Sequence, residues 1–208
     1  MEKYLSLERE AENEIVIERS RFITYVAPAE NEEQARSFIE KIKKRHSLAT
    51  HNCSAFVVEK GMIKRSSDDG EPSGTAGVPI LDAILSQNLV DCVVVVTRYF
   101  GGIKLGAGGL VRAYSKSASE GLKCGGIVEY EFCQILELNL SYDQFAKVNQ
   151  MVATKNLKVV NVAYGEGVIM EIAVPKKNCY SFLETISDLL KGDVRLKIKL
   201  EKFENLKN

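Results

Sequence analysis

The run "DCVVVVTRYF", residues 91–100, most constrains what this chain can fold into. Its β-branched residues favour an extended backbone that packs well on both sides. A half-exposed strand alternates apolar and polar residues, whereas this run is almost continuously apolar. The run therefore predicts a central strand of a sheet that is covered on both faces.

Strand and helix patterns alternate around this run through the first part of the chain. Residues 31–46 have helical apolar spacing after Asn31, a residue type that caps helix starts, and the first turn is acidic. Lys60-Gly61 marks a hairpin turn. The remaining expected elements are two strands or one long bent strand over 13–29, hairpin arms within 52–67, a helix over 78–88, a glycine-rich connection over 101–109 and a helix over 110–126.

The pattern changes after residue 127. The sequence predicts a strand over 128–142, a helix over 143–156, a hairpin over 158–175, a helix over 178–192 and a last strand over 193–203. This β-α-β-β-α-β order is the split pattern of a ferredoxin-like sandwich. We therefore expect an α+β protein of two domains, residues 1–128 and 129–208, each with as many basic as acidic residues.

Charge and cysteine content exclude several classes of protein. Lys plus Arg total 28 and Asp plus Glu total 28, so no bulk positive field draws the chain to nucleic acid or a membrane. The five cysteines form no CxxC pair, which fits reduced thiols rather than disulfides or zinc ligands. The longest apolar run is too short to span a bilayer, and no signal-peptide core follows the first Met. We expect a cytoplasmic protein with no membrane partner, metal or cofactor.

The stretch "SSDDGEPSGTAGVPI", residues 66–80, holds the first candidate site. Asp68, Asp69 and Glu71 are candidates for a general base or for cation ligands, although their spacing matches no calcium loop. The same letters suit a turn in which Ser73 or Thr75 caps the following helix. Such a dense set of turn and polar residues favours a functional surface, but it does not say of which kind.

The segment "TRYFGGIKLGAGGLVR", residues 97–112, holds the second candidate site. The first site, with "GEPSGTAG", is no Walker loop because no Lys follows its glycine, and this segment places Val111 where the third glycine of the G-x-G-x-x-G fingerprint would fall. It is nevertheless a strand-to-helix glycine loop, so backbone N–H groups at a helix start are available to an anion. The candidate phosphate-binding residues here are Arg98, Gly101, Gly102, Lys104, Gly106 and Arg112. Alternatively, the glycines only let the chain bend and the helix pack closely.

Other reactive residues carry weaker signals. His46, His51 and Cys53 match no nucleophile motif or metal spacing, and we interpret His46 as a helix-end residue and His51 as a strand residue. The alternative is a Ser-His-Asp or Cys-His site through Cys53. The last predicted strand carries Arg195, Lys197 and Lys199 at alternate positions. Such a row contacts RNA on an exposed sheet or, more simply, forms a solvated face.

Two long motifs give the chain a family resemblance. "DDGEPSGTAGVPIL" and "VVVVTRYFGGIKLGAGGLVRAYS" closely resemble the central signature of the YigZ/IMPACT family in its bacterial two-domain form. The resemblance implies a first domain like the second domain of ribosomal protein S5 and a ferredoxin-like second domain, a pairing similar to the last two domains of elongation factor G. The matching residues are Asp68, Asp69, Gly70, Glu71, Pro72, Gly74, Gly77, Arg98, Tyr99, Gly101, Gly102, Leu105, Gly106 and Arg112.

Eukaryotic members of this family regulate translation initiation, which implies a translation-associated role. We therefore expect a non-enzymatic factor that binds RNA, the ribosome or translation factors. In this hypothesis Ser73, Arg98, Lys104 and Arg112 contact phosphates, and Tyr99 offers a stacking ring. The alternatives are a hydrolase or phosphate-handling enzyme that uses Asp68, Asp69 or Glu71, and a regulator that binds only protein.

Overall fold

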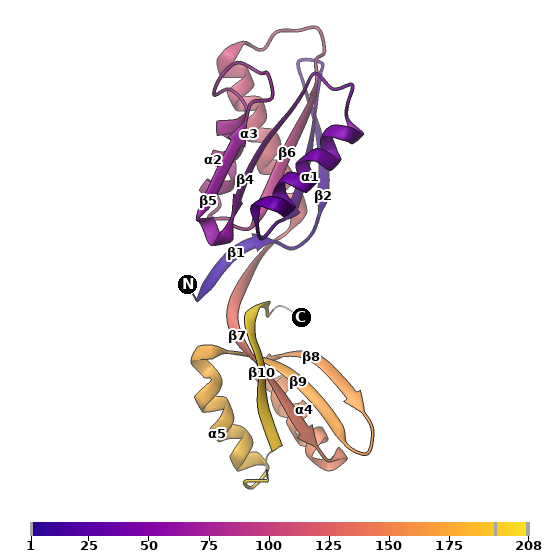
Figure 1. Ribbon diagram of the computed structural model, residues 1–208, viewed down its shortest axis with the longest axis vertical. Helices are drawn as coiled ribbons and strands as arrows, with labels where there is room; N and C mark the ends of the chain where they lie inside the picture. The colour runs from indigo at the N-terminus through magenta and orange to yellow at the C-terminus, as the bar shows by residue number, and fades with distance from the viewer. Residues whose placement is uncertain (1, 194, 207–208) are drawn as a thin grey trace. The chain divides into compact units, whose positions relative to one another are not determined.

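The computed structural model describes residues 2–193 and 195–206 (Figure 1). Contacts along the chain divide it into two compact units, which are described separately. One unit runs from Tyr4 to Val128, and the other comprises Glu129 onward together with the residues before Tyr4. Within the described residues, no helix is long and apolar enough to cross a membrane.

The first unit contains a five-stranded sheet in which every pair of neighbours is antiparallel. The apolar run of residues 91–100 forms its central strand, as predicted. The strand order is β2 (Ala11–Ile17), β3 (Ser20–Pro28), β6 (Cys92–Tyr99), β4 (His51–Val58) and β5 (Ile63–Ser67), with a 3-10 turn, η1 (Glu59–Gly61), in the predicted hairpin connection.

Helices cover both faces of this sheet (Figure 1). Val93 and Val95 of β6 pack with α1 (Glu32–Arg45), and Val94 and Val96 pack with α2 (Gly77–Ser86) and α3 (Gly106–Gly125) on the other face. The alternation of side chains along a strand divides one valine run between two cores. The expectation of a strand covered on both faces is confirmed.

Local signals placed several elements correctly. Asn31 caps α1, because its side chain accepts a hydrogen bond from the backbone N–H of Gln34 at 2.9 Å. The short strand β1 (Lys3–Leu7) was not predicted, although Leu7 is buried in the core of the first unit. Five residues carry too little periodicity to show a strand.

Helix α3 begins earlier than the sequence indicated. The predicted helix started at Leu110, but residues Gly106 to Gly109 already form its first turn. Each glycine costs a helix about 1 kcal/mol relative to alanine. Packing of buried residues such as Leu110 and Tyr114 into the core outweighs this cost, as tertiary contacts commonly override propensity.

The second unit has the predicted β-α-β-β-α-β order. Its strands pair antiparallel in the order β10-β7-β9-β8, and β7 residues Leu136, Leu138 and Leu140 pack in one core with both helices. Val194, part of the predicted last strand, lies outside the described residues. The elements are β7 (Ile127–Leu140), α4 (Tyr142–Thr154), β8 (Lys158–Tyr164), β9 (Val168–Pro175), the short η2 (Lys176–Asn178), α5 (Cys179–Leu189) and β10 (Arg195–Asn205).

A close approach of α3 to β3 gives a test of this packing. A Cβ atom at Gly121 would lie 2.4 Å from Cγ2 of Thr24, whereas one at Gly108 would meet nothing nearer than Arg112 Nη1 at 3.5 Å. We expect Gly121→Ala to destabilise the protein by about 1–3 kcal/mol. Gly108→Ala in the same helix should raise stability by up to about 1 kcal/mol. Chemical denaturation measures both, and equal effects would contradict the close packing.

Candidate functional site

Asp68 caps helix α2 and thereby closes the acidic loop, defined as residues 68–76 between β5 and α2. Its Oδ1 accepts hydrogen bonds from the backbone N–H groups of Ala76 at 3.0 Å and Gly77 at 2.8 Å, and Oδ2 accepts one from Gly74 at 2.9 Å. The predicted capping residues do not fill this role: Ser73 is exposed, and the Thr75 hydroxyl donates to the carbonyl oxygen of Pro72.

These bonds set the charge state of Asp68. Burial acts to raise the pKa of this carboxyl group, but the three backbone N–H groups outweigh burial and hold its pKa below the ordinary value. A carboxylate at a helix start is also stabilised by the helix dipole. Asp68 is therefore an ionised structural cap whose oxygens are already occupied.

Asp69 ties the loop to the sheet and to α1. One of its oxygens accepts a hydrogen bond from the backbone N–H of Asn52 at 2.7 Å, and the other pairs with the Lys43 ammonium at 2.8 Å. Its carbonyl oxygen accepts a hydrogen bond from Nδ1 of His51 at 2.9 Å. Asp69 thus fixes the loop against the beginning of β4.

Glu71 forms a buried ion pair with Arg98 at the end of β6. Arg98 Nη1 lies 2.6 Å from Glu71 Oε1, and the two side chains are only 6% and 3% exposed. The Tyr114 hydroxyl of α3 donates to the same oxygen at 2.9 Å. The pair joins the acidic loop, the central strand and α3 in one hydrogen-bonded network.

Aromatic and polar groups surround the Arg98 guanidinium. Its Cζ lies 5.5 Å from the ring centres of both Phe22 and Phe100, within cation–π range. Nη2 donates to the Ser20 hydroxyl at 3.4 Å, whereas Nε is buried and has no hydrogen-bond partner among the described residues. His51 Nε2 lies 3.8 Å from the second Glu71 oxygen.

The neighbouring thiol and phenol are uncharged. Burial raises the pKa of the Cys53 thiol to about 12, and burial likewise raises the pKa of the Tyr114 phenol above its usual range. The Cys53 thiol donates to the carbonyl oxygen of Asp68 at 2.9 Å. A buried neutral thiol is a poor nucleophile, so Cys53 serves packing and hydrogen bonding.

All three carboxylates of the loop are therefore bound to protein groups. Nowhere in the described part of the chain do three His, Cys, Asp or Glu side chains gather in a way that would hold a metal ion. The catalytic roles of Asp68, Asp69 and Glu71 stay predictions, and each would require its carboxylate to leave the partners described above.

Arg98 and Tyr99 project to opposite faces of the sheet because neighbours in a strand alternate. The Tyr99 hydroxyl lies 3.0 Å from Nδ1 of His46, on the face covered by α1, and Arg21 lies over its ring at 5.6 Å. Burial lowers the pKa of His46. The stacking role of Tyr99 stays a prediction; Phe100, which sequence reasoning passed over, is the exposed aromatic of this loop.

Lys104 and Arg112 are the exposed cations of the glycine loop and the start of α3. In the regions that the structure describes, neither has a carboxylate oxygen within 4.0 Å. Gly102 and Gly106 have φ of 86° and 69°, which favour glycine, and the Gly101 backbone lies against that of Arg19 and Ser20. The first turn of α3 has no acidic residue and no side-chain cap.

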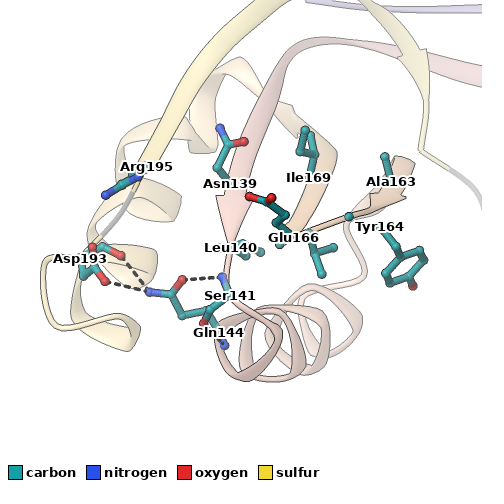
Figure 2. Close-up of a pocket in the computed structure, with 13 residues that line it drawn as sticks. Asn139, Leu140, Ser141, Gln144, Ala163, Tyr164, Glu166, Ile169, Asp193 and Arg195 are labelled. Carbon is teal, nitrogen blue, oxygen red and sulfur yellow. Dashed lines mark hydrogen bonds between the residues drawn. The ribbon is translucent and has the colours of Figure 1, made fainter.

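The second unit offers a groove at the end of β7 and the β8–β9 turn (Figure 2). Figure 2 shows Gln144 of α4 between Ser141 and Asp193, and it donates to Asp193 at 3.2 Å. Of the predicted cation row, only Arg195 lines this groove. The other two members are paired: Lys197 with Glu137 at 2.9 Å and Lys199 with Glu171 at 2.6 Å.

Family models cover both units. The Impact N-terminal domain matches residues 18–122, and a domain of unknown function, DUF1949, matches residues 138–193. The chain is 44% identical over 198 residues to the IMPACT family member YvyE of Bacillus subtilis (strain 168), covering 95% of this chain and 91% of that protein. The chain belongs to the IMPACT family.

Further relatives support the assignment of this chain to the IMPACT family. It is 32% identical to the IMPACT family member YigZ of Escherichia coli (strain K12), over 86% of this chain and 90% of that protein. Protein IMPACT of Oryctolagus cuniculus is 35% identical over 94 residues, 42% of this chain and 29% of that protein. A solved crystal structure of a hypothetical protein is similar with a TM-score of 0.62 and 30% identity, covering 97% of this chain and 100% of that chain.

The Glu71–Arg98 pair can be tested by a double-mutant cycle. Glu71→Gln leaves a buried cation without its partner, so we expect a loss of about 3–5 kcal/mol of stability. The double variant Glu71→Gln/Arg98→Met removes that cation as well and should recover part of the lost stability. Glu32→Gln, which breaks an exposed pair with Arg36, should cost under about 1 kcal/mol. Urea unfolding of the wild type, Glu71→Gln, Arg98→Met, the double variant and Glu32→Gln gives the cycle and its control. A Glu71→Gln loss as small as that of Glu32→Gln would contradict the buried pair.

The Asp68 cap predicts a pH dependence. Because the folded pKa lies below the ordinary value of 3.8, the carboxylate stabilises the fold fully above that pH, and this contribution is lost as the pH falls through the folded pKa. We expect Asp68→Asn to cost about 1–2 kcal/mol at neutral pH and progressively less in acid. Melting temperatures between neutral and acid pH test this, with exposed Asp82→Asn as control. A difference that stays constant with pH would rule out the charged cap.

Proposed function

We propose that this protein is a translation-associated regulatory factor that binds RNA through its glycine-loop face, defined as residues 101–109 with Arg112. The observation that carries the proposal is the pair of exposed, unpaired cations, Lys104 and Arg112, beside the uncapped start of α3. Backbone N–H groups at a helix start and nearby cations together suit phosphate groups.

The neutral charge of the chain directs this proposal to a local surface. Because the acidic and basic totals are equal, attraction to phosphates has to come from a few cations without partners. The family resemblance supports translation as the setting, through its eukaryotic members. The strand order β10-β7-β9-β8 supports a ferredoxin-like second domain, which we propose beside a first domain like the second domain of ribosomal protein S5.

Within this proposal, Arg98 supports the binding face from behind. Its guanidinium contacts the Ser20 hydroxyl, which also accepts a hydrogen bond from the backbone N–H of Gly101 at 3.2 Å. Ser20 thereby links the buried ion pair to the first residue of the glycine-loop face. Ser73, exposed in the acidic loop, stays a candidate contact.

Binding to ribosomal particles and to a mixed RNA pool, titrated over salt, tests the proposal. We expect saturable binding that weakens with salt, and Lys104→Met and Arg112→Met should each reduce the slope of log K against log salt by about 1. Lys64→Met removes an exposed cation from β5, outside this face, and should change neither quantity. Absence of binding at low salt, or equal loss in all three variants, would overturn the proposal.

A further inference from the structure

We infer that a cavity beside the start of α3 accepts a single nucleotide, so that RNA is recognised as an unpaired strand. This inference rests on the proposed function and adds its ligand class. The cavity measures about 380 Å³ and lies between the β2–β3 turn, the glycine loop and the first turns of α3. This volume is near the lower end of the range of small-molecule sites, about 300–1,000 Å³.

Three cations line the cavity: Lys104, Arg112 and Lys116. Arg112 and Lys116 are four residues apart on α3, so their side chains share one helix face. Lys116 has only a distant carboxylate partner, Glu120 at 3.9 Å, and the other two have none within 4.0 Å among the described residues. Glu18 is the single carboxylate among the lining residues, so positive charges outnumber negative ones there and suit a phosphate group.

Apolar side chains also line the cavity, which a phosphate alone does not need. Ile17, Ile103 and Leu105 line it with Ala113. Branched aliphatic side chains suit the flat apolar face of a base, which gains from leaving water. Gly109 lines the cavity without a side chain that would fill it. A Cβ atom there would lie 3.0 Å from Cβ of Leu105 and would meet no other residue within 4 Å. The combination of cations and apolar wall matches a nucleotide, with both a phosphate and a base.

Glu18 gives the cavity a means to choose between bases. It lies in the tight β2–β3 turn with φ of 46° and lines the cavity. A carboxylate accepts hydrogen bonds from exocyclic amines such as N4 of cytosine, and uracil has no such amine. We therefore expect cytosine-containing strands to bind more tightly than uracil strands of the same length.

Duplex RNA does not fit this site. Bases in a duplex are paired and stacked, whereas bases of loops and single strands can be turned outward into a protein pocket. A cavity that holds one nucleotide therefore selects unpaired RNA, while contacts of phosphates with the surface alone would not distinguish the two forms.

Fluorescence anisotropy with a labelled oligocytidine of about ten nucleotides tests the inference. We expect the single strand to bind at least tenfold more tightly than the same strand annealed to its complement. Cytidine monophosphate should displace the bound strand, whereas inorganic phosphate at equal concentration should not. Gly109→Met, which fills the cavity, should remove the preference for the single strand. Val111→Met, at an exposed position of α3 outside both the cavity and the glycine-loop face, should leave it intact.

A second variant keeps the test independent of the folding of Gly109→Met. Glu18→Met removes the acceptor but leaves the cations, so the affinity ratio of oligocytidine to oligouridine should fall to about one. Equal affinity for single strand and duplex without displacement by the mononucleotide would overturn the single-nucleotide site and leave the proposed RNA-binding function standing. Absence of binding to every RNA at low salt would overturn both.

Discussion

The buried ion pair of Glu71 and Arg98 is the interaction on which the arrangement of the first unit depends. Taking two charges out of water costs several kcal/mol for each ion, and their mutual attraction offsets this only with good geometry and further hydrogen bonds. Tyr114 and Ser20 supply those bonds, and the two aromatic rings shield the guanidinium. Since the partners come from the acidic loop, β6, α3 and the start of β3, a change at any one of them disturbs how the two loops are held.

The same pair decides which residues are left to meet a ligand. The charge of Arg98 is cancelled by Glu71, so it adds little to the field outside the protein. The alternation of β6 turns Tyr99 toward α1, away from the loops. Of the cations that follow the strand, Lys104 lies on the loop and Arg112 and Lys116 lie on α3, and all three line one cavity. The carboxylates of the acidic loop, the first feature to suggest chemistry, are bound to groups of the protein itself.

Local patterns made much of the fold predictable, and distant contacts account for what was missed. The valine run and the Asn31 cap depend on neighbours within a few residues, so the sequence alone indicated both. Asp68 reaches residues six to nine positions ahead, and no periodicity links Glu71 with Arg98. The cavity depends on the β2–β3 turn lying beside α3, which only the folded sheet brings about. The early start of α3 was hidden because packing overrides the low helix propensity of its glycines.

Charge pairing reconciles a neutral chain with a proposed anionic ligand. On β10, Lys197 lies against Glu137 of the neighbouring strand β7, and Lys199 lies against Glu171 of β9, the next strand beyond, so these two lysines are neutralised where they stand. Exposed pairs of this kind are individually weak, yet they cancel the field that a row of lysines would otherwise project. Attraction for phosphate is then set by the few cations that lack a partner, not by the net charge. In the first unit such cations line a cavity with an apolar wall, and that coincidence of charge and shape separates the glycine-loop face from an ordinary solvated surface.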